Sequence, residues 1–229
     1  MTKTPTALGS MRLRRRILRH HLPLALVSGI AMLLIGILVD GHHDSLTRRL
    51  TVGSAFVGTA LVAATLLIGP LNILRARPNP ISADLRRDIG IWAGIISLLH
   101  VVAGFRSHGD TMPWEFFIDA DGRIPLRLDA WGQANWLGLA ATMILVLLLA
   151  LSNDRALRGL GTGRWKALQR SNYGLLALIA VHGWIYIPGE DRSIAYSIVL
   201  GLIVLVVISI QIAGMIQRQK IQATKRATA

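Results

Sequence analysis

Cysteine is absent from the 229 residues, and acidic residues are scarce. The missing cysteine excludes disulfide bonds, thiolate metal sites, iron–sulfur clusters and thiol nucleophiles. Charged residues make up 16% of the chain, and its 12 Asp and Glu residues are outnumbered by 25 Lys and Arg residues. Together with 52% hydrophobic residues, this shortage of charge is typical of a membrane protein rather than a soluble domain.

The net charge of +13 raises the question of nucleic-acid binding. The basic residues, however, form short clusters between apolar runs, which is the pattern of membrane topology signals. No Gly-rich nucleotide fingerprint follows a strand-like run, so the chain contains no flavin or nicotinamide domain. We therefore expect membrane lipid, and no nucleic acid, as the main surroundings of this protein.

Six stretches are long and apolar enough to span a bilayer, which takes ~20 residues and tolerates ~17. They cover residues 22–39, 51–74, 89–105, 134–151, 171–187 and 194–216. The first run is too long for the apolar region of a signal peptide, so we interpret it as a retained helix. The sequence predicts an all-α integral membrane protein, with a six-helix transmembrane bundle over 22–216 between a basic N-terminus (1–21) and a basic tail (217–229).

The basic residues also predict the orientation of this bundle. Nineteen of the 25 Lys and Arg residues fall on the side that holds both termini and the loops 75–88 and 152–170, and six fall on the other side. By the positive-inside rule, both termini are then cytoplasmic. The expected location is the bacterial inner membrane.

The outer loop 106–133 is the longest stretch outside the predicted spans, and it is rich in aromatic and acidic residues. Its bulky rings are Trp114, Phe116, Phe117 and Trp131. Such rings favour the headgroup level, so we expect a surface structure lying on the bilayer. The run IDADGRI lacks the later ligand positions of an EF-hand and is interpreted as an ordinary acidic turn.

Two of the apolar stretches contain a single histidine each, His100 in 89–105 and His182 in 171–187. Each lies 11 residues inside its segment, or ~16 Å along a helix axis, so their imidazoles share one depth. Neutral imidazoles on facing helices form a bis-axial site for haem iron. Zinc or copper would need a third or fourth ligand, and the sequence has none at this depth. The alternative is that each histidine makes an interhelical hydrogen bond.

The other five histidines are weaker candidates. His20 and His21 lie in the basic lead-in and are interpreted as interface anchors. His42 and His43 are interpreted as part of a solvated turn, although they could hold a surface metal. His108 belongs to the outer loop and is expected to be exposed to solvent.

Three segments resemble the ferric reductase-like transmembrane domain. They are LLIGPLNILR (66–75), RRDIGIWAGIISLLHVVAG (86–104) and RWKALQRSNYGLLALIAVHGWIYI (164–187). Within that family they are similar to the haem-binding membrane subunit of the bacterial periplasmic methionine sulfoxide reductase system. The resemblance implies a b-type haem, with His100 and His182 as axial ligands, that carries electrons across the membrane. It also implies quinol or a flavoprotein as the donor and an extracytoplasmic reductase as the partner, and it allows FMN as a second cofactor.

The sequence departs from this family at two positions. Gln169 stands where relatives carry a further histidine 13 residues before the fifth-helix ligand, and Arg86 stands at the partner position. Neither is a normal haem ligand, so the comparison predicts one haem, on the outer side. The resemblance makes Arg86, Arg87 and Arg170 candidates for contacts with haem propionates, flavin phosphate or anionic lipid, with stop-transfer charge as the alternative.

The leading expectation is a single-haem electron-transfer subunit of an oxidoreductase, with no catalytic residue of its own. One alternative is the membrane component of a ferric-chelate reductase, which would need a separate flavoprotein. The other is a haem-free scaffold or transporter whose histidines are structural. Spans nearly free of charge argue against a transporter.

Overall fold

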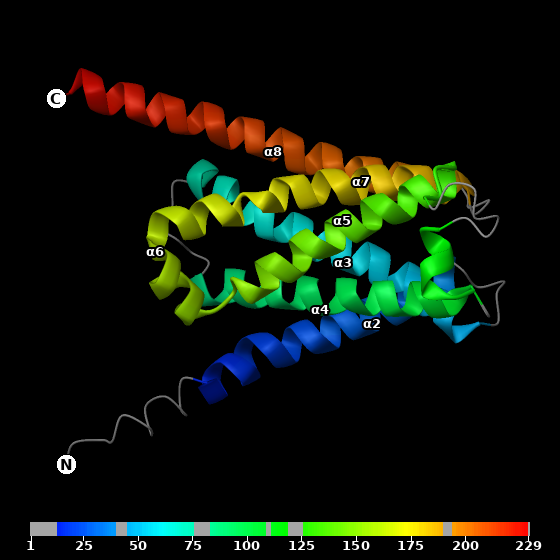
Figure 1. Ribbon diagram of the computed structural model, residues 1–229. Helices are drawn as coiled ribbons and strands as arrows, with labels where there is room; N and C mark the ends of the chain where they lie inside the picture. Colours follow the sequence, from blue (N-terminus) through cyan, green and yellow to red (C-terminus); the bar gives the residue numbers. More distant parts are fainter. Residues whose placement is uncertain are drawn as a thin grey trace, which may run out of the picture.

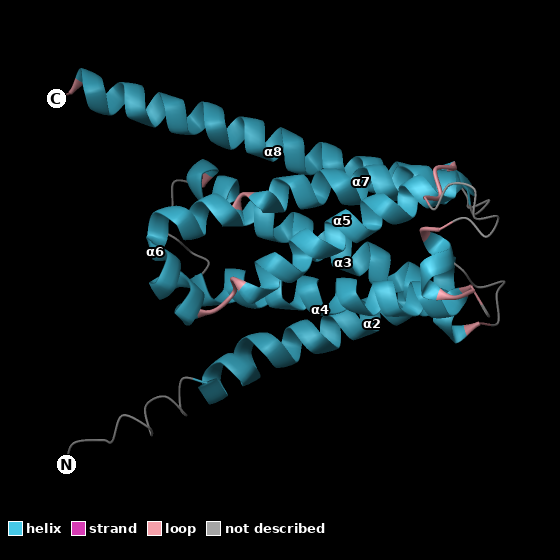
Figure 2. Cartoon of the chain, viewed as in Figure 1, coloured by secondary structure: helices cyan, strands magenta, loops and turns pink. Residues whose placement is uncertain are grey.

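The computed structural model describes residues 13–39, 45–75, 83–108, 111–118, 126–189 and 194–228. Within these residues the chain is helical and no strand forms (Figure 2), which confirms the expected all-α class. The α-helices are α2 (Leu22–Val39), α3 (Leu46–Leu74), α4 (Ala83–Ser107), α5 (Ala130–Ala150), α6 (Asp154–Gln169), α7 (Ser171–Gly189) and α8 (Ile194–Ala227). A π-helical turn, η1 (Ile17–His21), precedes α2, and a 3-10 turn, η2 (Pro113–Phe116), lies between α4 and α5.

The helices form an elongated bundle in which α3 is the most enclosed member (Figure 1). α4 and α2 pack against α3, α5 packs against α7, and α8 contacts both α3 and α7. Because α4 and α5 contact each other little, the bundle contains two closely packed pairs, α3–α4 and α5–α7. α6 crosses one end of the bundle, which we call the α6 end, and the opposite end holds η2 and is called the η2 end.

Glycines set how closely α2 and α4 approach α3. A Cβ atom at Gly58 of α3 would lie 2.7 Å from Oγ of Ser97 on α4. A Cβ atom at Gly36 of α2 would lie 2.6 Å from the carbonyl oxygen of Arg49 on α3. Lipid gives helices no hydrophobic reason to associate, so close van der Waals contact through small residues supplies the packing instead.

The largest group of buried apolar side chains joins the two helix pairs. Its members are Val62, Ala63, Leu66, Ala93, Ala141, Leu145, Leu175, Leu176 and Val207. The outward faces of α2 and α8 are different, because they leave large apolar side chains exposed, among them Val27, Leu38, Leu202 and Leu205. Apolar exposure on this scale marks a surface that is covered by something other than water, and a bilayer provides that cover.

Within the part of the chain that the structure describes, five helical segments are long and apolar enough to cross a membrane. They are Leu13–Leu38, Leu46–Leu74, Asp84–Ser107, Ala130–Ala150 and Ile194–Ala227. α7 is not among these five, because its 19 residues include the polar Asn172 and His182, which lower its mean hydropathy. The five segments and their exposed apolar faces mark a multi-pass membrane protein in a lipid environment.

Two helices exceed the limits expected from the sequence. α8 continues as a helix to Ala227, through most of the predicted basic tail 217–229. α4 begins at Ala83 and ends at Ser107, so it carries two more residues at the η2 end than the predicted span 89–105. The apolar run marks only the part of each helix that faces lipid, whereas the hydrogen-bonded backbone continues into polar sequence.

α6 fills part of the segment 152–170, where the sequence predicted a loop. Its charged and apolar residues alternate with a helical period, so it has an apolar face without an apolar run. The helix bends at Gly161, whose φ of 71° is a conformation that favours glycine. The indole nitrogen of Trp165 donates to the carbonyl oxygen of Leu151 at 3.0 Å, which ties α6 to the end of α5.

Candidate functional site

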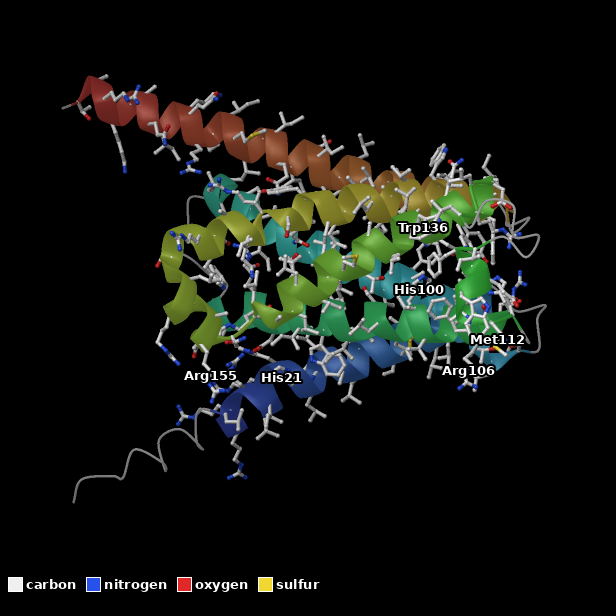
Figure 3. The ribbon with its side chains drawn as sticks, viewed as in Figure 1. His21, His100, Arg106, Met112, Trp136 and Arg155 are labelled. Carbon is white, nitrogen blue, oxygen red and sulfur yellow. The ribbon has the colours of Figure 1, made fainter. Side chains whose placement is uncertain are left out.

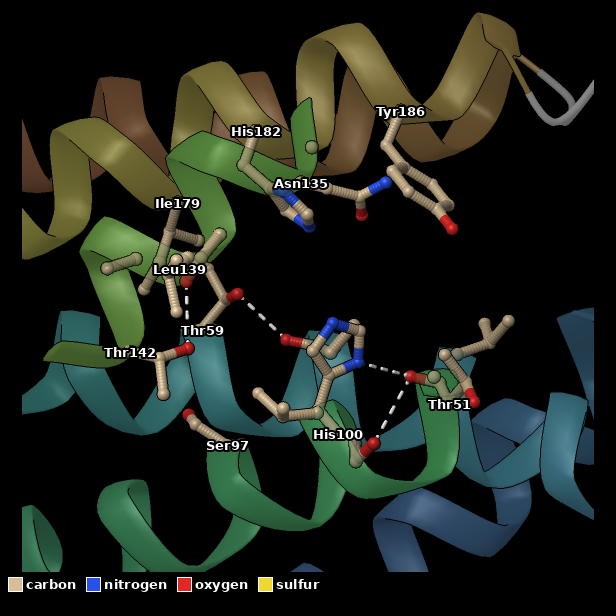
Figure 4. Close-up of a pocket in the computed structure, with 18 of the residues that line it drawn as sticks. Thr51, Thr59, Ser97, His100, Asn135, Leu139, Thr142, Ile179, His182 and Tyr186 are labelled. Atoms are coloured by element: carbon tan, nitrogen blue, oxygen red, sulfur yellow. Dashed lines mark hydrogen bonds between the residues drawn. The ribbon is translucent and has the colours of Figure 1, made fainter. Parts of the chain in front are cut away.

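His100 of α4 and His182 of α7 face each other across a cavity of about 300 Å³ (Figure 4). Their ring centroids are 6.4 Å apart and the two ring planes are at 83°. The cavity lies between the α3–α4 pair and the α5–α7 pair, in the half of the bundle nearer η2. The structure therefore brings together the two histidines that the sequence placed at one depth.

A backbone carbonyl orients each of these imidazoles. Nδ1 of His100 hydrogen-bonds the carbonyl oxygen of Thr51 at 2.9 Å, and Nδ1 of His182 hydrogen-bonds that of Ala134 at 2.7 Å. A carbonyl oxygen only accepts hydrogen bonds, so Nδ1 carries the hydrogen and Nε2 carries the lone pair in each neutral ring. This is the tautomer in which an imidazole ligates a metal through Nε2 while its other nitrogen is held in place.

Gly138 on α5 lets the His182 ring lie close to that helix. A Cβ atom at Gly138 would lie 3.0 Å from Nδ1 and 3.1 Å from Cε1 of His182. The carbonyl oxygen of Ala134, which holds the same Nδ1, lies one helical turn before Gly138. The missing side chain thus lets α5 approach α7 closely enough for this hydrogen bond.

The spacing of the two rings suits a single metal ion between them. An imidazole nitrogen lies ~2 Å from a metal that it ligates, so two imidazoles on opposite sides of one ion have centroids roughly 6 Å apart. The observed separation is 6.4 Å. Among the described residues, no group of three or more His, Cys, Asp or Glu side chains could hold a metal ion. The two imidazoles are therefore close enough to ligate one metal ion between them, and their spacing fits a bis-imidazole haem site.

The cavity is apolar toward the α6 end. Its walls there are made by Ala141, Leu145, Leu175 and Ile179. Two threonine hydroxyls in this region donate to carbonyl oxygens of their own helices, Thr59 to Ala55 and Thr142 to Gly138, each at 2.7 Å. Hydroxyls engaged in this way leave a surface that suits a flat apolar molecule.

Toward the η2 end the same cavity is polar. His108, Asn135 and Tyr186 line it there, and the Tyr186 hydroxyl lies 3.2 Å from Nε2 of His108. The Tyr186 ring is also next to the His182 ring, with centroids 5.4 Å apart. Asn135 lies between His182 and Tyr186 (Figure 4).

The expected exposure of His108 is wrong. Its side chain is partly buried and lines the cavity, and its Nδ1 lies 3.0 Å from the carbonyl oxygen of Gly104. The reason is the length of α4, which ends at Ser107 and so places this ring about two turns beyond His100 on the cavity side. The spacing of eight residues from His100 is consistent with the same helix face, but the apolar run ends at residue 105 and so predicted a loop at His108.

The aromatic residues of the 106–133 segment also differ from expectation. Phe116 is 3% exposed and stacks on Trp131 with ring centroids 4.8 Å apart, so it closes the η2 end of the cavity instead of lying at the surface. Trp114, at 57% exposure, remains at the surface. The acidic turn IDADGRI falls largely outside the described residues, as do His42 and His43.

At the first residue before α5, Asp129 is a helix cap. Its carboxylate accepts the backbone N–H of Gly132 at 2.6 Å and the Nε–H of Arg127 at 3.0 Å. The hydrogen bond from Gly132, with the neighbouring guanidinium, holds the pKa of Asp129 below its usual value. Arg127 in turn lies over the Trp131 ring, 4.4 Å from its centroid. The cap thus connects the start of α5 to the aromatic group that closes the cavity.

The three arginines considered as phosphate or propionate contacts lie at the α6 end, far from the cavity. Arg86 and Arg170 are exposed, and Arg87 pairs with Asp154 at 2.6 Å. None of them lines the cavity of His100. Figure 3 shows the same separation, with Arg155 at one end and His100, Trp136 and Arg106 toward the other.

A buried carboxylate at the α6 end was missed in the sequence. Asp88 of α4 is 0% exposed and contacts three basic side chains from the η1 region. Arg16 forms an ion pair with it, His20 Nδ1 lies 2.7 Å from its Oδ2, and His21 Nε2 lies 3.4 Å from its Oδ1. The two histidines, interpreted from the sequence as interface anchors, thus contact a buried acid. The π-helical turn brings all three bases to one side, and no sequence periodicity predicts such a turn.

Fold and site define a class: a multi-pass helical membrane protein with two imidazoles that face each other inside the bundle. No family model matches the chain, and no solved structure matches it. A curated protein that is similar to part of the chain is the magnetosome protein MamZ of Magnetospirillum gryphiswaldense, 30% identical over 124 residues. The match covers 54% of this chain and 17% of MamZ, so it spans a small part of that relative.

Proposed function

We propose that this chain is the b-type haem subunit of a membrane redox system, with His100 and His182 as the axial ligands of one haem. The observation that carries the proposal is the pair of rings 6.4 Å apart, each held through Nδ1 by a backbone carbonyl. Two interhelical hydrogen bonds alone would not require the rings to face each other across a cavity.

In this proposal the backbone carbonyls orient the two imidazoles, and the apolar side chains surround the haem. The carbonyl oxygens of Thr51 and Ala134 keep both Nε2 atoms aimed into the cavity. The apolar walls around Leu145 and Leu175 exclude water, which lowers the local dielectric and helps to set the redox potential. When bound, a b-type haem supplies a one-electron carrier.

The topology that we propose has six spans, namely the five long apolar segments and α7, which is the fifth in chain order. α7 packs between α5 and α8 and carries His182 inside the bundle, so its polar residues face protein rather than lipid. The α6 end then faces the cytoplasm, as the excess of Lys and Arg there supports, and the membrane is the bacterial inner membrane. Electrons would pass from a quinol or flavoprotein donor to an extracytoplasmic reductase. As part of the proposal we assign the chain to the ferric reductase-like family, on the resemblance of residues 66–75, 86–104 and 164–187.

The test is a pyridine haemochrome assay and an absorption spectrum on the full chain purified in detergent. We expect a b-type spectrum with one haem per chain, which His100→Ala or His182→Ala abolishes. His21→Gln, which changes a histidine at the α6 end, is the matched control and should keep the haem. A wild-type protein without a b-type spectrum, or a spectrum that survives both alanine variants, would refute the proposal.

A further inference from the structure

The cavity between His100 and His182 is more polar at one end than at the other. Its walls toward the α6 end are mainly aliphatic. The hydroxyls of Thr59 and Thr142 there are engaged with carbonyl oxygens of their own helices, and Ser97 adds one further hydroxyl. At the η2 end it is lined by the polar side chains of His108, Asn135 and Tyr186. A ligand that fills the cavity must therefore have one polar edge and an apolar remainder, and its polar edge must point toward η2.

Asn135 supplies the most specific signal at this end. Its Nδ2 atom is buried and makes no hydrogen bond with any described residue. In this conformation Nδ2 has no surface open to the cavity, and a half-turn of the amide would exchange it with Oδ1 and let it donate to a ligand there. Asn135 follows Ala134, whose carbonyl holds His182, and it lies beside the His182 ring (Figure 4). The unsatisfied donor therefore lies beside one of the two proposed iron ligands.

Tyr186 and His108 add two more groups that can donate. The Tyr186 ring is one helical turn beyond His182, and its hydroxyl lies 3.2 Å from Nε2 of His108. The carbonyl oxygen of Gly104 accepts from Nδ1 of His108 at 3.0 Å, so the neutral His108 ring accepts at Nε2 and the protonated ring donates there. The Tyr186 O–H therefore donates to Nε2 of the neutral His108 ring, and the same O–H can turn from there to an acceptor on a ligand. No Asp or Glu is among the described residues that line the cavity, so no side-chain carboxylate there would repel an anionic edge of a ligand.

We propose that Asn135 and Tyr186, with His108 behind them, bind the carboxylates of the porphyrin, so that its carboxylate edge points toward η2. This inference rests on the proposed function, since it concerns the orientation of the same cofactor. A porphyrin of the b type has two carboxylates on one edge and an apolar remainder, which is the distribution of polarity that the cavity requires. Carboxylates accept strong hydrogen bonds from neutral donors, and these bonds strengthen as water is excluded. The arginines of the α6 end lie on the wrong side of the iron ligands for this role.

The test compares protohaem IX with its dimethyl ester, in which both carboxylates are masked. Haem-depleted full-length chain in detergent is titrated with each compound, and binding is followed by absorption. The wild-type chain should bind the free acid about tenfold or more tightly than the ester, as expected for losing one or two charge-assisted hydrogen bonds. Asn135→Leu and Tyr186→Phe should each reduce this ratio severalfold, by weakening the binding of the acid while leaving that of the ester unchanged.

Thr142→Val is the matched control, because it alters a polar side chain in the apolar half of the cavity. It should keep the wild-type ratio between acid and ester. Equal affinity of the wild-type chain for both compounds would overturn the orientation and leave the haem proposal standing. A parallel loss of both affinities in the Asn135 and Tyr186 variants would also overturn it, since it would mean a structural role. If the chain bound neither compound, the proposed function itself would fail.

Discussion

Gly138 offers a test of how the His182 ring is held, because a substitution there changes the contact between α5 and α7 and leaves His182 itself in place. In Gly138→Val the new Cβ would lie 3.0 Å from Nδ1 of His182, several tenths of an ångström inside ordinary contact, and the two methyl groups would add to the clash. Either the ring turns or α5 moves away from α7. Both responses lengthen the 2.7 Å hydrogen bond between Nδ1 and the Ala134 carbonyl.

The expected cost follows from two contributions. Overpacking a close contact costs ~1–3 kcal/mol, and the loss of one hydrogen bond costs ~1 kcal/mol. If about 1–3 kcal/mol of this appears in cofactor binding, haem affinity falls roughly 5- to 150-fold. Valine has a better helix propensity than glycine by less than ~1 kcal/mol, so this gain offsets only part of the lost free energy of unfolding.

The assay is haem content and affinity of the purified variant, with the low-spin signal of the ferric protein as a reporter of axial ligation. Gly201→Val on α8 is the matched control, because a Cβ there meets nothing within 4 Å. We expect Gly201→Val to bind haem as the wild type does and Gly138→Val to lose most of it. If both variants kept wild-type affinity and spectrum, the inference that α5 must approach the His182 ring closely would be refuted.

Two further predictions concern groups outside the cavity. Asp129→Ala removes the cap of α5 and should lower stability by roughly 1 kcal/mol at neutral pH. The pKa of Asp129 is lowered in the folded protein, so this stabilisation is present above the unfolded pKa of ~3.9 and is lost as the pH falls through the lowered folded value. The unfolding temperatures of the wild type and of Asp129→Ala should therefore converge in acid. Asp88→Asn leaves Arg16 and His20 without their buried anion and should destabilise the protein on the order of 3 kcal/mol, seen as a lower unfolding temperature in detergent. Asp84→Asn, on the same helix, is its control, and an equal loss of stability in both variants would contradict a specific role for Asp88.

The apolar runs predicted most of the fold, since lipid requires long uncharged helices and few other sequences satisfy that requirement. The apolar runs did not predict helices that continue outside the lipid-facing part of the bundle. α6 has a helical backbone with alternating charged and apolar residues, and the end of α8 is helical in basic sequence. In both places a hydropathy criterion indicates a loop, while the backbone continues its hydrogen bonds.

Equal depth along two helices that enter from the same side predicted that the two histidines lie at one level of the bundle, and the packing of the helices brings their rings to face each other. Asn135 could not be found in this way. It lies at the start of α5, at the edge of a predicted span, and its importance comes from an unsatisfied donor that only the packed structure reveals. Tyr186 lies four residues beyond His182 and so shares its helical face. This spacing in the sequence already indicates that Tyr186 lies beside the cavity.

The division of the bundle into two packed pairs has a consequence for biosynthesis. His100 belongs to the α3–α4 pair and His182 to the α5–α7 pair, 82 residues apart in the chain. At translation rates of about 5–20 residues per second, the second histidine emerges roughly 4–16 s after the first. During this interval α3 and α4 can already associate, with His100 on an uncovered face. Insertion of α7 then completes the cavity, so the proposed haem could be held by both histidines only late in assembly, after the two helix pairs have been made in sequence.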